Sequence, residues 1–289
     1  MKGIILAGGS GTRLFPVTLA TSKQLLPVYD KPLIYYPLST LMLLGIRDVM
    51  LISSPRDLPR IKDLLGDGSR FGMRLCYREQ KEPNGIAEAF LIAADWIQGE
   101  EVSLILGDNI FHGSQLFQQI KTDLKNDERG ARVIGYRVAD PRRYGVVELD
   151  SNLKATSIVE KPQDPKSNWA VTGLYFYDSQ VVDIAKNLKP SNRGELEITD
   201  LNREYLKQGE LSVTCCSRGV TWIDAGTPDS LLDAATYVEV LEKRQGLKIA
   251  CPEEIAVLNG WMEAKKVRSD LAEFSNSDYA KYLMRVLEG

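Results

Sequence analysis

The chain has 289 residues, with 36 lysines and arginines against 39 aspartates and glutamates, so its formal net charge at pH 7 is −3. This balance provides no basic surface of the kind that nucleic-acid binding requires, and no segment has the apolar length of a membrane span. The first apolar run breaks at Gly8 and Gly9, before a signal peptide would be complete, so we expect a cytoplasmic protein.

Short apolar runs alternate with amphipathic stretches of helical length along the first half of the chain. Strands are predicted at residues 2–7, 48–53, 73–78, 102–107 and 131–138, and helices near residues 33–44, 57–65, 84–97 and 114–125. This alternation is typical of a mostly parallel sheet covered on both faces, with ligands beyond the carboxyl ends of its strands. We therefore predict a Rossmann-like α/β fold with three layers, α/β/α.

After residue 140 the pattern changes, and antiparallel additions to the sheet are expected. Residues 144–149 and 153–159 form a predicted hairpin across residues 150–152, and residues 171–177 form a further strand. From Pro228 onward the sequence is helical in character, with helices predicted at residues 230–244, around 252–261 and near 278–287. We expect residues 1–227 to form the α/β core and residues 228–289 to form a helical extension packed on it, or the whole chain to be one domain.

The most informative motif is a glycine-rich loop that directly follows the first predicted strand. Gly8, Gly9 and Gly11 let the backbone approach an anion closely, and Arg13 adds a planar cation. The loop lacks the Gly-Lys-Ser/Thr of the Walker pattern, and the dinucleotide pattern fails because Leu14 replaces its last glycine. The loop indicates a nucleotide phosphate site, with a plain turn between two elements as the alternative.

Two aspartates that follow strand-like runs can bind a divalent cation. Asp108 comes after residues 102–107, and Asp224 follows residues 221–223. Mg²⁺ in proteins usually takes one or two carboxylates together with substrate phosphates, so this pair is sufficient for a magnesium site. The alternative for each aspartate is that it only caps the loop or helix that follows.

The cysteines and the single histidine argue against other kinds of site. Cys76, Cys215, Cys216 and Cys251 contain no C-x-x-C pair, so we expect reduced thiols and no structural zinc. His112 is expected in a loop, and no nucleophile-elbow or cysteine-protease pattern accompanies it. Catalysis through a Cys–His or Ser–His pair is therefore not predicted.

Five segments follow one another over almost the whole chain: the glycine loop, Lys-Gln-Leu-Leu-Pro at 23–27, Leu-Gly-Asp-Asn at 106–109, Glu-Lys-Pro at 160–162 and Trp-Ile-Asp-Ala-Gly-Thr at 222–227. In this order and spacing they resemble the sugar-phosphate nucleotidylyltransferases. Gln24 and the Tyr-Gly-Val-Val run at 144–147 resemble the branch of that family that uses dTTP.

The resemblance implies a reaction, a cofactor and partners. A deoxythymidylyl group would pass from dTTP to α-D-glucose 1-phosphate, giving dTDP-glucose and pyrophosphate by Mg²⁺-assisted in-line displacement at the α-phosphorus. Neither nucleic acid nor a membrane is expected as a partner. The alternatives are a UTP- or CTP-dependent relative of the same class and a regulatory homologue that binds nucleotide without catalysis.

The resemblance also implies roles for individual residues. The nucleotide is expected on Gly8, Gly9, Gly11, Thr12, Arg13, Lys23, Gln24, Gln80, Pro83, Gly85 and Asp108. The sugar phosphate is expected on Tyr144, Gly145, Glu160, Lys161, Val171 and Arg193. The expected catalytic residues are Arg13, Lys23, Asp108 and Lys161, and the expected metal ligands are Asp108 and Asp224. Without the resemblance, Gln24 and Gln80 would be interpreted as solvated surface residues.

Trp222 is expected mainly as a core residue, with one edge towards the ligand. At the level of assembly, the resemblance implies a homotetramer built as a dimer of dimers, with the C-terminal helices at an interface. It further implies a second nucleotide site used for feedback, which we connect only with the region of His112 and Arg218.

Overall fold

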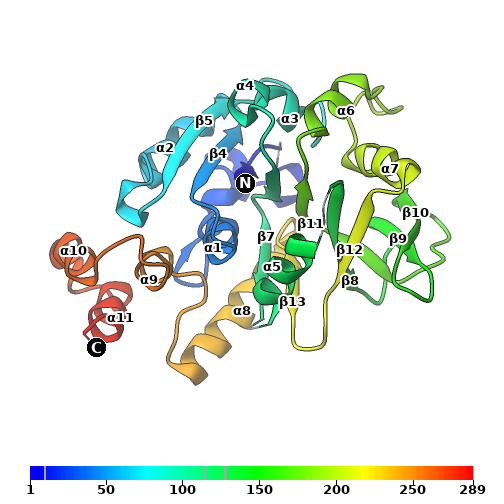
Figure 1. Cartoon of the computed structure of the whole chain (residues 1–289). Helices are drawn as coiled ribbons and strands as arrows, with labels where there is room; N and C mark the ends of the chain where they lie inside the picture. The colour runs from blue at the N-terminus through cyan, green and yellow to red at the C-terminus, as the bar shows by residue number, and fades with distance from the viewer. Residues whose placement is uncertain (10, 114, 127–128, 289) are drawn as a thin grey trace.

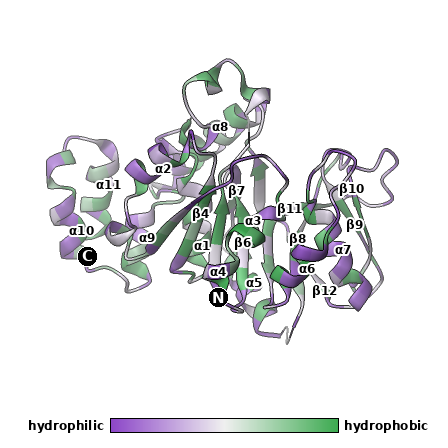
Figure 2. Cartoon of the chain, turned by 90° about the horizontal axis from the view of Figure 1, so that it is seen from above, coloured by the Kyte–Doolittle hydropathy of each residue, from purple (hydrophilic) through white to green (hydrophobic). Residues whose placement is uncertain are grey.

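The computed structural model describes residues 1–9, 11–113, 115–126 and 129–288 (Figure 1). A large mixed sheet runs through the molecule between helices, and the last helices of the chain, from residue 252 onward, lie at one side. Hydrophobic residues follow the central strands, whereas the outer helices carry many hydrophilic ones (Figure 2). The predicted α/β class, with a largely parallel sheet and antiparallel additions, is confirmed.

The N-terminal half builds the parallel part of the sheet. β1 (Lys2–Leu6) lies between β4 (Asp48–Ser53) and β6 (Val102–Leu106) and is parallel to both, while β4 pairs in parallel with β5 (Arg74–Glu79). The inner residues of β1, β4 and β6 are buried, so these strands occur in the sequence as continuous apolar runs. That pattern explains why their predicted positions are correct to within one residue.

Two apolar clusters cover the two faces of this sheet. Ile5 belongs to the cluster that includes side chains of α1 (Tyr35–Leu43), α2 (Leu58–Leu65) and α5 (Leu116–Asn126). Its neighbour Ile4 belongs to the cluster that includes side chains of α3 (Glu88–Ile92), α4 (Ala94–Ile97), α6 (Val181–Asn187) and α7 (Ile198–Gln208). Because successive strand residues face opposite sides, the sheet lies between two helical layers.

The antiparallel additions are also confirmed. β9 (Gly145–Leu149) and β10 (Ala155–Glu160) form the predicted hairpin, and β11 (Trp169–Tyr177) is antiparallel to β6, β9 and β8 (Ala131–Arg137). A further strand, β12 (Leu211–Cys215), pairs in parallel with β8 and was not predicted. The helices α6, α7 and α10 (Ala264–Asp270) were not predicted either.

One predicted helix, at residues 84–97, forms later and in two pieces. Gly85 has a φ of +107°, and a Cβ at this position would lie 2.4 Å from the carbonyl oxygen of Leu196. The positive φ and this close approach keep Gly85 out of a helix, and α3 begins only at Glu88. The predicted helix at residues 114–125 begins with a residue outside the described ones, and α5 covers Leu116–Asn126.

The expectation that His112 lies in a loop was wrong. His112 ends β7 (Asn109–His112), which pairs antiparallel with β13 (Thr221–Asp224) in a small separate sheet. Because Asp224 stands opposite Asn109 in this pairing, the ladder brings Asp224 next to the segment of Asp108. The strand-like run before Asp224 corresponds to β13, whereas β7 was not recognised in the sequence.

The C-terminal region is helical, as predicted, with α8 (Pro228–Gln245), α9 (Pro252–Leu258) and α11 (Asp278–Val286). α8 packs on the hairpin of β2 (Pro27–Val28) and β3 (Lys31–Pro32) through an apolar cluster. In the part of the chain that the structure describes, we find no helix with the length and apolar character needed to cross a membrane.

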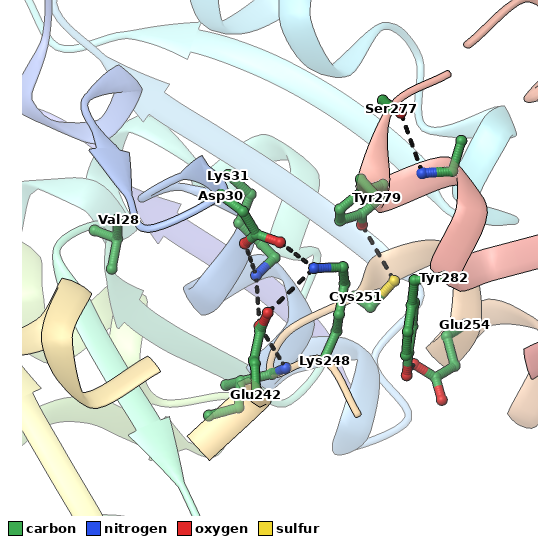
Figure 3. Close-up of polar contacts among 12 residues, drawn as sticks. Val28, Asp30, Lys31, Glu242, Lys248, Cys251, Glu254, Ser277, Tyr279 and Tyr282 are labelled. Carbon is green, nitrogen blue, oxygen red and sulfur yellow. Dashed lines mark hydrogen bonds and ion pairs between the residues drawn. The ribbon is translucent and has the colours of Figure 1, made fainter. Parts of the chain in front are cut away.

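A buried ion cluster reinforces this contact (Figure 3). The Lys31 ammonium lies 2.5 Å from Asp30 Oδ1 and 3.0 Å from Glu242 Oε1, while Lys248 lies 3.1 Å from Glu242 Oε2 and also pairs with Asp30. Lys31 is 3% exposed and Glu242 is 7% exposed. Because water scarcely reaches these two charges, they depend on the cluster for compensation.

Glu242→Gln is expected to lower the free energy of unfolding by about 2 kcal/mol, because charge-assisted hydrogen bonds to Lys31, Lys248 and the Ile249 N–H become weaker. Chemical denaturation at a fixed protein concentration measures the effect. The matched control is Glu239→Gln, which alters an exposed pair with Lys243 on the same helix and should change stability little. Equal losses in the two variants would contradict a special role for the cluster.

Candidate active site

Two loops meet at the carboxyl ends of β1 and β6. Gly8 and Gly9 follow β1, and Asp108 follows β6. The two strands are parallel neighbours, so their ends lie at one edge of the sheet, and the Gly107 N–H donates to the Leu6 carbonyl at 2.9 Å. The glycine loop and Asp108 therefore line the same region, as expected for a ligand site in an open α/β sheet.

Two cavities that share several lining residues open at this edge. The first, which we call the glycine-loop cavity, has a volume of about 270 Å³ and is lined by Gly8, Gly9, Lys23, Gln24, Gln80, Pro83, Gly85, Asp108, Glu160, Lys161 and Arg193, among others. The second, the β9 cavity, has a volume of about 460 Å³ and is lined by Arg13, Asp108, Arg143, Tyr144, Gly145, Glu160, Lys161, Val171, Thr199, Trp222 and Asp224, among others. Asp108, Glu160 and Lys161 line both.

Four of the expected site residues are not placed with most of the residues expected on the same ligand. Arg13, expected on the nucleotide, lines the β9 cavity. Its guanidinium lies against Gly226, where an added Cβ would stand 2.8 Å from Arg13 Nη2. Arg193, expected on the sugar phosphate, lines the glycine-loop cavity and pairs with Glu197 at 2.7 Å. Gly11 and Thr12 are not among the lining residues of either cavity, and Thr12 is exposed in a short 3-10 turn.

Asp108 forms an ion pair with Lys23 at the junction of the two cavities. Burial opposes ionisation of Asp108, but the Lys23 charge and hydrogen bonds outweigh it and hold the pKa of this carboxyl below its ordinary value. Asn109 Nδ2 donates to Asp108 Oδ1 at 2.9 Å, and Asn109 Oδ1 in turn accepts from Trp222 Nε1 at 2.6 Å. Asn109 thus orients the carboxylate, a role that the sequence analysis missed.

Asp224 supplies a second carboxylate to the β9 cavity. Its burial and the negative charge of Asp108 raise its pKa, so the two carboxylates repel each other. A divalent cation would relieve this repulsion, and oxygen ligands of this kind suit Mg²⁺. Within the described residues no cluster of three or more His, Cys, Asp or Glu side chains is present. A metal held here would therefore need phosphate or water oxygens to complete its coordination.

Glu160 and Lys161 form the boundary between the cavities. Glu160 Oε2 accepts from Thr199 Oγ1 at 2.6 Å, and Glu160 Oε1 lies 3.2 Å from Lys161 Nζ. Lys161 has a φ of +42°, a conformation uncommon for residues with a side chain, and its N–H donates to the Tyr144 carbonyl at 3.0 Å. Thr199 could not be identified from the sequence, because α7 itself was not predicted.

Aromatic side chains form a wall of the β9 cavity. Trp222 is 8% exposed and packs edge-on against Tyr144 and Tyr136, with ring centroids 5.1 Å and 5.7 Å away. The predicted core role of Trp222 is confirmed, and its place in the cavity lining leaves an edge available to a ligand.

Gln24 and Gln80 are buried. The interpretation that they would receive without the family resemblance, as solvated surface residues, is therefore wrong. Gln24 is 2% exposed, its Oε1 accepts from Ser22 Oγ at 2.5 Å, and its Nε2 has no partner among the described residues. Gln80 is 8% exposed, and its Nε2 donates to the Gly85 carbonyl at 3.1 Å and to Glu88 Oε2 at 2.7 Å. Both side chains line the glycine-loop cavity.

Comparisons with known proteins agree with this arrangement. Residues 2–240 match the nucleotidyl transferase family. A glucose-1-phosphate thymidylyltransferase of Neisseria gonorrhoeae is 56% identical over 287 residues, which cover 99% of each chain. One of Mycolicibacterium smegmatis is 54% identical over 290 residues, covering 100% of this chain and 99% of the relative.

Solved structures agree as well. A Bacillus anthracis protein assigned as a glucose-1-phosphate thymidylyltransferase and crystallised with sucrose superposes with a TM-score of 0.77 at 43% identity, covering 82% of this chain and 94% of that chain. A UDP-glucose pyrophosphorylase bound to UDP-glucose, 24% identical with a TM-score of 0.75, shares the fold. The chain belongs to the nucleotidyl transferase family, among the glucose-1-phosphate thymidylyltransferases.

Proposed function

We propose that this protein transfers a deoxythymidylyl group from dTTP to α-D-glucose 1-phosphate, releasing dTDP-glucose and pyrophosphate. Relatives of this name match the chain over nearly its full length. The observation that supports this proposal most strongly is the junction of two cavities at Asp108 and Lys161, beside a glycine loop. This geometry suits two phosphate-bearing substrates whose reacting atoms meet at the junction.

We place the nucleotide in the glycine-loop cavity and the sugar phosphate in the β9 cavity. Backbone N–H groups at Gly8 and Gly9 would face the triphosphate, and Lys23 would neutralise a phosphate oxygen near the α-phosphorus. In the β9 cavity, Glu160 would accept hydrogen bonds from hexose hydroxyls, and Lys161 would hold the hexose phosphate. Tyr144, Gly145 and Val171 would complete the wall around the sugar.

The reaction needs no nucleophilic side chain. An oxygen of the hexose phosphate would attack the α-phosphorus, and the bond to the β-phosphate would break with its electron pair leaving on pyrophosphate. The protein would act by holding the two substrates in line and by placing Arg13, Lys23 and Lys161 against the negative charge of the reacting groups. Mg²⁺ on Asp108 and Asp224, together with the substrate phosphates, would add further charge neutralisation.

The base is recognised, in our proposal, beside Gln80 and Gly85. Both N–H groups of the Gln80 amide are engaged, so Oε1 remains as an acceptor, and the Gly85 backbone N–H has no acceptor among the described residues. An acceptor beside a donor complements the imide edge of thymine or uracil. Cytosine has a ring-nitrogen acceptor where thymine has its N3–H, so a CTP-dependent relative is disfavoured, while UTP remains an alternative substrate.

A pyrophosphate-release assay tests this function against that of a non-catalytic regulatory homologue. We expect release only when dTTP, glucose 1-phosphate and Mg²⁺ are all present. Binding of dTTP without release of pyrophosphate would support the regulatory alternative instead.

Arg13→Lys is expected to lower kcat by about tenfold or more while changing the KM for dTTP less, because lysine retains the charge but loses the planar fork that matches phosphate oxygens. Steady-state kinetics with glucose 1-phosphate at saturation measure both constants. If only KM changes, Arg13 is a ground-state binding residue and the role proposed here is incorrect.

We also propose a homotetramer with a second nucleotide site, on the strength of the family resemblance. His112 lies at the end of β7 with its ring 6.0 Å from that of Tyr237, and Arg218 is exposed in the turn before β13. Light scattering gives the mass of the assembly. The number of nucleotides bound per chain, from calorimetry, tests for the second site.

A further inference from the structure

The orientation of the Gln80 amide is determined by its neighbours. Gln80 directly follows β5, and its backbone N–H donates to the Ser53 carbonyl at 2.8 Å. Its Nε2 has two acceptors, the Gly85 carbonyl and the Glu88 carboxylate. Its Oε1 accepts no hydrogen bond from a described residue. Gly8 lies next to this oxygen, because a Cβ added to Gly8 would stand 3.0 Å from it. The carbonyl end of the amide therefore faces the side of the glycine loop.

Glu88 is the group that makes the opposite orientation unfavourable. Its Oε2 accepts from Gln80 Nε2 at 2.7 Å, and its Oε1 accepts from Asn84 Nδ2 at 2.8 Å. An ionised carboxylate can only accept hydrogen bonds. A half-turn of the Gln80 amide would place its carbonyl oxygen against this carboxylate and leave the Gly85 carbonyl without its donor. Glu88 thus fixes which end of Gln80 reaches the cavity.

We propose that Glu88 is a positioning residue for base selection, which keeps Gln80 Oε1 as an acceptor for the imide N–H of thymine or uracil and thereby disfavours cytosine. The inference rests on the proposed function, because it assumes that the base lies beside Gln80. Glu88 would act only through Gln80. Glu88 lines neither cavity. Its neighbours in the sequence do, since Gly85 lines the glycine-loop cavity and Ile86 lines both.

Glu88→Gln is the most direct test, because the new amide can donate a hydrogen bond and so accommodate Gln80 in its flipped orientation. We expect the ratio of kcat/KM for dTTP to kcat/KM for dCTP to fall by about tenfold or more, the size expected when one hydrogen bond of this kind is exchanged. The KM for glucose 1-phosphate should stay within about twofold, because the β9 cavity is untouched.

The matched control is Glu79→Gln, the same chemical change on an exposed carboxylate next to Gln80 for which no side-chain hydrogen bond or ion pair is found among the described residues. This variant should leave the dTTP to dCTP ratio unchanged. An unchanged ratio in Glu88→Gln, or a parallel loss with both nucleotides and with glucose 1-phosphate, would show that Glu88 is structural and would overturn the proposal.

N3-methyl-dTTP provides a test whose first part uses the unaltered enzyme alone and so does not depend on folding of a variant. Because this analogue lacks the imide N–H, the unaltered enzyme should use it at least about tenfold less efficiently than dTTP, and Glu88→Gln should narrow that difference. Equal use of the two nucleotides by the unaltered enzyme would overturn the proposed role of Gln80 and Glu88 while dTDP-glucose still forms. Failure of the proposed function looks different, because no dTDP-glucose would then form from dTTP at all.

Discussion

Asp108→Asn is expected to reduce turnover by at least about a hundredfold while the protein remains folded, in line with losses on disturbing metal or transition-state contacts. Asp108 lines both cavities, pairs with Lys23, and shares the β9 cavity with Asp224, whose pKa is raised first by burial and then by the charge of Asp108. An amide retains the shape but contributes no negative charge for a divalent cation. The variant should therefore also need a higher Mg²⁺ concentration to reach its own maximal rate.

The control for this experiment is Asp178→Asn, since Asp178 accepts from the Tyr205 hydroxyl at 2.9 Å and lines neither cavity of the site. That variant should keep normal turnover at temperatures where it is folded. Circular dichroism establishes that both proteins are folded before the rates are compared. Near-normal activity of Asp108→Asn, or full activity of the unaltered enzyme in chelator, would refute the assignment of the carboxylate pair.

Lys161→Ala should weaken binding of glucose 1-phosphate far more than binding of dTTP, and Lys23→Ala should do the reverse. Each loss is expected to be roughly 1.5–3 kcal/mol, the range for a charge-assisted hydrogen bond. Lys161 follows Glu160 at the boundary of the β9 cavity, whereas Lys23 lines only the glycine-loop cavity of the two. The two lysines would thus stand on opposite sides of the reacting phosphorus.

Calorimetric titration of each variant with each substrate separately measures these losses. Lys23→Ala also leaves the buried Asp108 carboxylate without its ion-pair partner, so its folding must be checked before titration. Equal weakening of both ligands in both variants would mean that the lysines share one site, and the division between them would have to be abandoned.

The sequence predicts the parallel half of the fold well, because buried strands such as β4 are continuous apolar runs separated by amphipathic helices. Shorter elements were missed because they contain too few residues to show a periodic pattern. β7 has four residues and α6 has seven, so neither carries enough periods to be recognised. Their positions depend on contacts with distant segments. The division of the chain at residues 227 and 228 stays a prediction.

At the site, the sequence motifs led to most of the residues that line the two cavities, but they could not assign each side chain to a cavity. Arg13 lies within the 3-10 turn Thr12–Leu14, which begins directly after Gly11, and its guanidinium lies next to Gly226 near the β9 cavity. Asn109 and Glu88 were missed as positioning residues. Asn109 belongs to the Leu-Gly-Asp-Asn segment, but its role depends on Trp222, which is distant in the sequence. Glu88 has no sequence pattern that sets it apart from an ordinary polar residue.

The identity of the product is the most direct test of the whole account. The enzyme is incubated with glucose 1-phosphate, Mg²⁺ and one of dTTP, UTP or dCTP, and the sugar nucleotide is identified by mass spectrometry and quantified with pyrophosphate. We predict dTDP-glucose and pyrophosphate in equal amounts from dTTP, much less product from dCTP, and none in chelator. Formation of dTMP without dTDP-glucose, or absence of any sugar nucleotide from dTTP, would contradict the proposed transfer between the two cavities.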